Sequence, residues 1–101
     1  MVDLRKIRDY CLNPDHPRGR HKARVFVVAL GLTLVDAEEL RDALLVAASD
    51  REAVITERDE HGQRYALDFE MIRAAGRARV RSNWIVRSGE DFPRLTSCYV
   101  L

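Results

Sequence analysis

Cysteine and lysine are both scarce in this sequence of 101 residues. The two cysteines, Cys11 and Cys98, are too few for the disulfide framework of a small secreted domain or for a four-ligand zinc site. No apolar run approaches the roughly 18 residues that a membrane helix requires. Charged residues also occupy the N-terminal stretch in which a secretion signal has its apolar centre. We therefore expect a single cytoplasmic domain without a membrane segment.

The motifs of several common activities are absent as well. The sequence contains no glycine-rich phosphate loop and no dinucleotide-binding fingerprint. Its three histidines and two cysteines do not follow the spacing of metal ligands. We therefore expect neither a metal nor a cofactor.

Arginine supplies nearly all of the positive charge. Fifteen of the 17 basic residues are arginine, only two are lysine, and the net charge is +1. Guanidinium groups suit phosphate and carboxylate, which favours a nucleic-acid partner. A GC-rich genome explains the same excess together with the abundant alanine and valine, and composition alone favours this second explanation.

The charges are segregated along the chain. Residues 1–24 contain seven basic and three acidic residues, residues 25–61 contain three and nine, and residues 62–101 contain seven and four. This basic–acidic–basic order predicts a basic surface on a molecule that is nearly neutral overall.

The first half of the sequence predicts two to three helices. Asp3 is a suitable N-cap for the first, and prolines end it and stiffen the loop that follows, in which Gly19 is the flexible point. Gly31 stops the second helix, and Asp36 is in the cap position of the third. The expected helical ranges are residues 4–11, 20–30 and 37–49.

From Glu52 onward the apolar residues recur with a period of two, which predicts β-strands. The links between the strands are short, so a four-stranded antiparallel meander is the simplest topology. The expected strands are residues 52–58, 63–72, 77–87 and 94–100.

The residue pattern of the two central strands predicts how they pair. If Ile72 faces Arg77, one face of the pair is apolar throughout. The opposite face then places acidic residues against arginines, with Asp68 across from Arg81 and Glu70 across from Arg79. A slip of one residue would destroy both patterns.

The last strand is expected to continue the same alternation. It places Leu95, Ser97, Tyr99 and Leu101 inward and Arg94, Thr96 and Cys98 outward. The fold class is therefore α+β, with the helices packed on one face of the meander and a bare, polar face opposite.

Two groups of basic residues are candidates for an anion site. Residues 16–22 hold two imidazoles, two guanidiniums and an ammonium at the start of a helix, whose N–H groups attract anions. The alternative is a solvated loop in which His16 only satisfies a local hydrogen bond. The outward sheet face carries six arginines suited to an RNA backbone, and ion pairs would occupy two of them. The four without an expected partner are Arg64, Arg77, Arg87 and Arg94.

A long motif at residues 12–26 carries a family resemblance. It reads Leu-Asn-Pro-Asp-His-Pro-Arg-Gly-Arg-His-Lys-Ala-Arg-Val-Phe, and Leu30-Gly31 follow it. With shorter motifs at residues 61–65, 84–85 and 93–96, it resembles an uncharacterised bacterial domain family. Members of that family are small stand-alone proteins or the C-terminal tips of polymorphic toxins. Their layout is similar to the ribonuclease fold of barnase, EndoU, colicin nucleases and RelE.

The resemblance implies metal-independent cleavage of RNA. In that reaction a base removes the 2′-hydroxyl proton, the oxygen attacks the phosphorus, and an acid protonates the leaving oxygen. Cations stabilise the added charge on the phosphate. We expect His16 to act as base or acid, because an imidazole pKa of about 6.5 suits both roles. The other catalytic candidates are Lys22, Arg81 and Thr96, and the phosphate-binding candidates are Arg18, Arg20, Arg87 and Arg94.

Two non-catalytic functions remain open beside this one. The unpaired arginines of the bare sheet face would also bind an acidic cognate protein, such as an antitoxin or an immunity-type partner, and His16 would then be structural. The same surface suits a domain that binds RNA without cleaving it.

Overall fold

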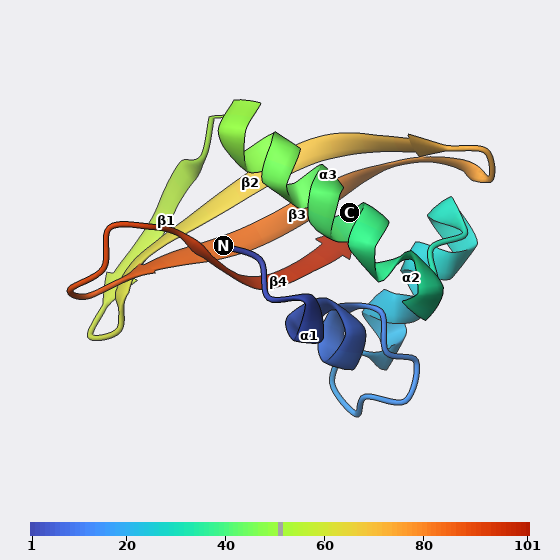
Figure 1. Ribbon diagram of the computed structural model, residues 1–101, viewed down its shortest axis with the longest axis horizontal. Helices are drawn as coiled ribbons and strands as arrows, with labels where there is room; N and C mark the ends of the chain where they lie inside the picture. The colour runs from blue at the N-terminus through green and yellow to red at the C-terminus, as the bar shows by residue number, and fades with distance from the viewer. Residues whose placement is uncertain (51) are drawn as a thin grey trace.

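Helices precede a four-stranded antiparallel sheet in the computed structural model, which describes residues 1–50 and 52–101 (Figure 1). The α+β class and the meander order β1-β2-β3-β4 confirm the sequence prediction. The bounds of each strand lie within two residues of the expected ones. The strands are β1 (Val54–Asp59), β2 (Gly62–Arg73), β3 (Gly76–Arg87) and β4 (Arg94–Val100).

The helical part begins with α1 (Leu4–Lys6), which continues as a π-helical turn, η1 (Ile7–Cys11). The Asp3 carboxylate accepts a hydrogen bond from the backbone N–H of Arg5 at 2.9 Å, which confirms Asp3 as the N-cap. Helix α2 (Arg20–Leu30) has the expected bounds. It ends because Gly31 adopts a left-handed conformation, with φ of 64°, that side chains disfavour.

The start of α3 (Ala37–Asp50) differs from the prediction. A 3-10 turn, η2 (Leu34–Asp36), precedes this helix, and Thr33 occupies the N-cap position of the turn. Asp36 therefore does not cap α3. Its carboxylate accepts the backbone N–H of Thr33 at 2.9 Å and closes a capping box around the turn.

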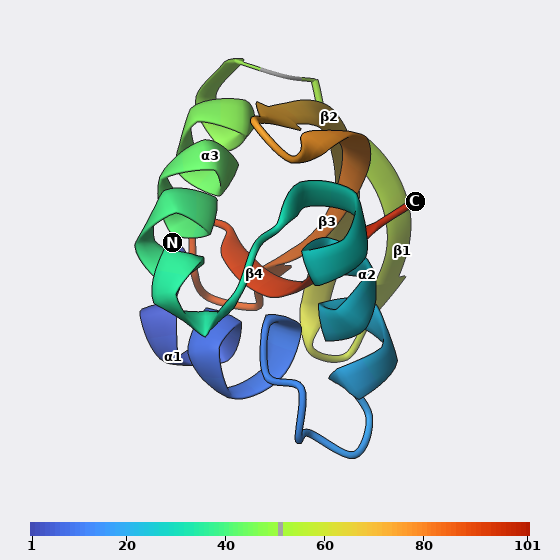
Figure 2. The same cartoon turned by 90° about the vertical axis from the view of Figure 1, so that its right-hand side faces the viewer.

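The β2–β3 pairing has the expected register. Tyr65 lies opposite Trp84, and Asp68 lies opposite Arg81. On the inward face of the two strands, Leu67, Phe69, Met71, Val80 and Trp84 are buried. These residues form one core with Phe26 and Leu30 of α2 and with Leu40 and Leu44 of α3. Figure 1 shows α3 lying across β2 and β3, whereas α2 packs against β3 and β4 (Figure 2).

The expected alternation of β4 is wrong after Leu95. Leu95 pairs with Trp84, whereas Ser97 pairs with Asn83, so Thr96 is an extra residue on this strand. Such a β-bulge reverses the direction of the side chains that follow it.

The bulge exchanges the two faces of the second half of β4. Cys98 points into the core and is only 1% exposed, whereas we expected it to face outward. Ser97 and Tyr99, which we expected inside, lie on the outer face, and Tyr99 is across from Arg81. The bulge thus brings a hydroxyl and a phenol to the surface of the sheet.

The tip of the β2–β3 hairpin is fastened to the helices by Arg73. Its Nη1 donates to the backbone carbonyl of Leu30 at 2.8 Å, and its Nε donates to Glu39 Oε2 at 2.8 Å. One guanidinium therefore joins the end of β2 to the end of α2 and the start of α3. The neighbouring carboxylate of Glu39 raises the pKa of Arg73, so the contact stays ionised.

A buried hydrogen-bond relay in the core gives a test of the fold. The hydroxyl of Ser82, fully buried, donates to the Leu67 carbonyl and accepts from Trp84 Nε1, each at 2.8 Å. We expect Ser82→Ala to lower the free energy of unfolding by about 1–3 kcal/mol, because the indole N–H would lose its partner inside the core. Urea unfolding measures the change, with the exposed Ser88→Ala as the control. Equal stability of both variants would contradict the relay.

Candidate phosphate-binding site

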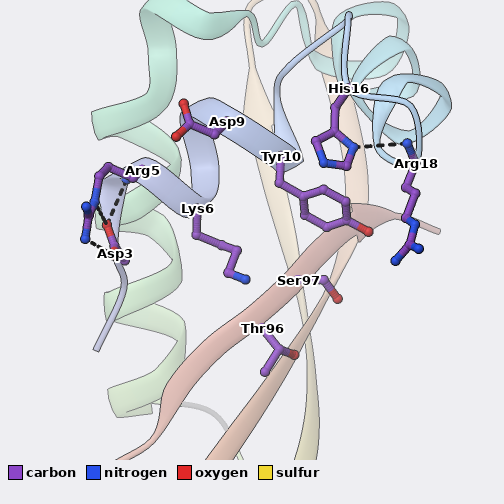
Figure 3. A pocket seen from close by; sticks show the side chains of 9 residues that line it. All are labelled: Asp3, Arg5, Lys6, Asp9, Tyr10, His16, Arg18, Thr96 and Ser97. Atoms are coloured by element: carbon purple, nitrogen blue, oxygen red, sulfur yellow. Dashed lines mark hydrogen bonds and ion pairs between the residues drawn. The ribbon is translucent and has the colours of Figure 1, made fainter.

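A cleft of about 640 Å³ opens where the first helical segment, the loop before α2 and strand β4 meet (Figure 3). We call it the N-terminal cleft. It brings together three predicted site residues, His16 and Arg18 from the loop before α2 and Thr96 from the distant strand β4. Its lining consists of Asp3, Arg5, Lys6, Asp9, Tyr10, His16, Arg18, Thr96 and Ser97.

His16 organises the loop that forms one wall of the cleft. Its Nδ1 accepts two hydrogen bonds, from the backbone N–H groups of Arg18 and Gly19, both at 3.0 Å. Because Nδ1 accepts both hydrogen bonds, it carries no proton, and the proton of the neutral imidazole is on Nε2. In this arrangement His16 offers the cleft an N–H donor, while the nitrogen with the free electron pair holds the loop.

The loop also packs tightly against the first helical segment. A Cβ atom on Gly19 would lie 2.5 Å from the backbone oxygen of Tyr10, so only glycine allows this approach. The ring of His16 meets that of Tyr10 edge-on, with 4.8 Å between the ring centroids. Gly19, which we expected to be the flexible point of the loop, is therefore the point at which the loop closes on η1.

The charges of the cleft leave two cations available. Asp3 and Arg5 neutralise each other through an ion pair at 3.2 Å. Lys6 and Arg18 form no ion pair within residues 1–50 and 52–101, so both can contact a ligand, and with the carboxylate of Asp9 the lining carries a net charge of +1. In Figure 3 the side chains of Lys6 and Arg18 extend toward β4.

Hydroxyl groups face the same space as these cations. Figure 3 shows the hydroxyl of Tyr10 between Lys6 and Arg18, with Ser97 of β4 beside it. The Ser97 hydroxyl oxygen accepts a hydrogen bond from Asn83 Nδ2 at 3.1 Å, which leaves its O–H free to donate. The Thr96 hydroxyl is already used, since it donates to the Asn83 carbonyl at 3.1 Å and holds the bulge. Cations with neutral O–H and N–H donors around them suit an oxyanion such as a phosphate.

The outer face of β4 extends this site beyond the cleft. Ser97 and Tyr99 lie on the same face of the strand, because side chains alternate in an extended chain. The ammonium of Lys22 sits 4.6 Å from the centroid of the Tyr99 ring, within the range of a cation–π contact. Arg81 lies opposite Tyr99 on β3. We call Lys22, Arg81 and Tyr99 the β4 cluster.

Arg81 is held by a carboxylate, as the register predicted. Its Nε and Nη2 bind the two oxygens of Asp68, each at 2.9 Å. This hydrogen bond lowers the pKa of Asp68, and the pKa of Arg81 is raised by the same contact and, to a smaller extent, by Tyr99. Glu70 lies opposite Arg79 as expected, but the ion pair expected between them is wrong, because Arg79 Nε approaches Asp68 at 4.0 Å instead.

Two of the four arginines that we expected to be unpaired have carboxylate partners. Arg94 binds Glu90 through two hydrogen bonds of 2.9 and 2.8 Å, and Arg64 binds Asp59 at 2.8 Å. These contacts lower the pKa values of Glu90 and Asp59. The candidate residues outside both the cleft and the β4 cluster are Arg20, Arg87 and Arg94.

Sequence reasoning missed several residues of the site. Lys6 and Tyr10 are four residues apart on the first helical segment, which places them on one side of it, and this spacing was the available signal. Ser97 and Tyr99 were assigned to the core, and nothing in the alternation indicated the bulge that turns them outward.

The described residues contain no group of three His, Cys, Asp or Glu side chains arranged to hold a metal ion. Within residues 1–50 and 52–101, no helix is long and apolar enough to cross a membrane.

A family model covers the entire chain. It is that of a domain of unknown function, DUF6883, and it matches residues 1–101. The chain belongs to the DUF6883 family. Membership confirms the expected resemblance to an uncharacterised domain family. No curated protein and no solved structure matches the chain.

The ion pair beneath the β4 cluster predicts a pH-dependent stability. The pKa of Asp68 is lower in the folded chain than the value of about 3.9 in an unfolded one. Its contribution is therefore complete above about pH 3.9 and is lost as the pH falls through the lowered value. We expect Asp68→Asn to lower the free energy of unfolding by about 1 kcal/mol at neutral pH.

Urea unfolding of both proteins between neutral and strongly acidic pH measures this difference. The two stabilities should converge only in the acidic range. Glu70→Gln is the matched control, because Glu70 forms no ion pair in the described part of the chain. A difference between wild type and Asp68→Asn that does not change with pH would contradict the assignment.

Proposed function

We propose that this domain binds the phosphate backbone of single-stranded RNA through the N-terminal cleft and the β4 cluster. The observation that carries the proposal is the convergence of Lys6, Arg18 and the hydroxyls of Tyr10 and Ser97 on one space. Charge-assisted donors around an open hollow are the usual means of holding a phosphate.

The extension of the site along β4 favours a polymer over a small anion. The cleft and the β4 cluster each contain more than one cation, and Ser97 and Tyr99 join them on one strand face. Two anion positions in a row suit successive phosphates of a nucleic acid. An accessible polar face beside them leaves room for unpaired bases, which supports a single strand.

His16 acts in this proposal as a positioning residue and a donor. Through Nδ1 it shapes the loop that carries Arg18, and through Nε2–H it can donate to a phosphate oxygen. Asparagine at this position would keep an acceptor for the loop and lack the distal donor, whereas alanine would lack both. The two substitutions therefore separate the two roles.

Fluorescence anisotropy with a labelled single-stranded RNA tests binding. We expect Lys6→Ala and Arg18→Ala each to weaken binding about fivefold and to reduce the slope of log K against log salt by about 0.7, the value for one lost phosphate contact. Arg58→Ala is the matched control, because Arg58 is an exposed arginine on β1 outside the site. His16→Asn should bind better than His16→Ala. Equal binding by all of these variants would refute the site.

RNA cleavage is a second candidate, which the β4 cluster favours. Lys22 and Arg81 meet at Tyr99 and can stabilise charge on a phosphate whose 2′-oxygen attacks it. The resemblance of the sequence to toxin-type ribonucleases supports this second candidate. His16 is hindered as the base because its free electron pair is engaged by two N–H groups. In this candidate reaction the 2′-hydroxyl proton therefore passes to solvent water, and Lys22 contributes as a cation that stabilises charge on the phosphate.

Incubation of the protein with labelled RNA, followed by analysis of the ends, tests cleavage. We expect products with a 2′,3′-cyclic phosphate and a loss of about a hundredfold in rate for Lys22→Ala. His16→Asn should keep most of the rate, and Arg58→Ala all of it. A wild-type rate no higher than that of Lys22→Ala, together with intact binding, would leave the domain as an RNA binder without this activity.

A further inference from the structure

Helix α2 carries an exposed apolar surface on the side away from the sheet. Val27 and Val28 are 47% and 77% exposed, and Leu34 and Val35 of η2 are 42% and 90% exposed. Single exposed aliphatic residues are ordinary on a soluble protein, whereas a group from two neighbouring segments marks an interaction site.

Three of these side chains, Val27, Leu34 and Val35, border a groove of about 470 Å³, which we call the α2 groove. Its apolar lining comes from the loop before α2, from α2 itself and from η2. The apolar residues are Leu12, Pro14, Ala23, Val27, Leu34 and Val35. The groove is distinct from the N-terminal cleft, since the two share no lining residue.

The charged residues of the groove have one sign. Arg20 and Arg24 lie one helical turn apart on α2, and both line the groove and are exposed. Neither forms an ion pair within residues 1–50 and 52–101, and no acidic residue lines the groove. An occupant that is apolar on one side and acidic at its edge would complement both features.

The backbone around the groove limits the form of the occupant. Beyond its first turn, the N–H and C=O groups of α2 are used within the helix, and η2 is closed by its capping box. No strand edge is available here for a partner to extend, so the partner must satisfy its own backbone. An amphipathic helix does this and presents apolar side chains at a spacing suited to a groove.

We propose that the α2 groove docks an acidic amphipathic helix of a partner protein. Apolar side chains of that helix would fill the space between Val27 and Val35, and its carboxylates would pair with Arg20 and Arg24. The aliphatic lining disfavours a nucleic-acid backbone, which has no apolar face to place against it. A protein partner would thus dock on α2, not on the bare sheet face, at a surface separate from the proposed RNA site.

Fluorescence anisotropy with two labelled peptides tests the proposal on the whole chain without RNA. One is an amphipathic helical peptide with leucines on one face and glutamates on the other, and the second has lysine in place of each glutamate. We expect saturable binding of the glutamate peptide only. Val27→Glu should weaken it about tenfold, while Val46→Glu, at an exposed valine on α3 outside the groove, should leave it within about twofold.

Charge reversal provides a second test that does not alter the apolar lining. The double variant Arg20→Glu with Arg24→Glu should lose the glutamate peptide and gain the lysine peptide. Equal binding of both peptides to the wild type, or no saturable binding up to about 1 mM, would overturn the proposal. Displacement of the peptide by RNA, or self-association of the chain that Val27→Glu abolishes, would assign the groove to a different occupant and overturn it as well.

Discussion

The register of the β2–β3 hairpin is the constraint on which the rest of the structure depends. Its inward face supplies Leu67, Phe69 and Trp84 to the core, and its outward face places Asp68 against Arg81. A slip of one residue would bury charge and expose the apolar side chains of the core at the same time, so two penalties together hold one alignment. The helices, β4 and the outer-face site all take their positions from it.

The bulge at Thr96 decides which side chains of β4 reach the proposed binding surface. Without the extra residue, Tyr99 would point into the core and Cys98 would lie outside, and Lys22 would have no ring beneath it. The hydroxyl of Thr96 donates to the Asn83 carbonyl and so ties the irregular strand to its neighbour. A single unpaired residue therefore decides which chemistry the sheet presents.

Sequence patterns predicted the fold where two independent signals agreed. The hairpin register rested on apolar alternation and on facing charges, and the end of α2 rested on its periodicity and on Gly31. For the last strand, the alternation of apolar and polar residues was the only signal in the sequence. Since Cys98 and Tyr99 are both acceptable in a core, that pattern is compatible with either face and contains no trace of a bulge.

The candidate site was predictable only in part, for a related reason. The charge of residues 16–22 indicated the loop, but the approach of Lys6, Tyr10 and Ser97 depends on how η1 packs against β4. The pairing of Arg94 with Glu90 spans the irregular link between β3 and β4, where sequence spacing implies no contact. Which arginines are free to bind a ligand depends on distances between elements, and no local sequence pattern encodes those distances.

The scarcity of lysine has a practical consequence once the two ammonium groups are placed. Lys6 lines the N-terminal cleft and Lys22 covers Tyr99, so both ε-amines of the chain lie at the proposed RNA site. A reagent that acylates amines would consequently report on this surface and on the N-terminus alone. Protection of these amines by a ligand is therefore a footprint of the site that requires no substitution in the chain.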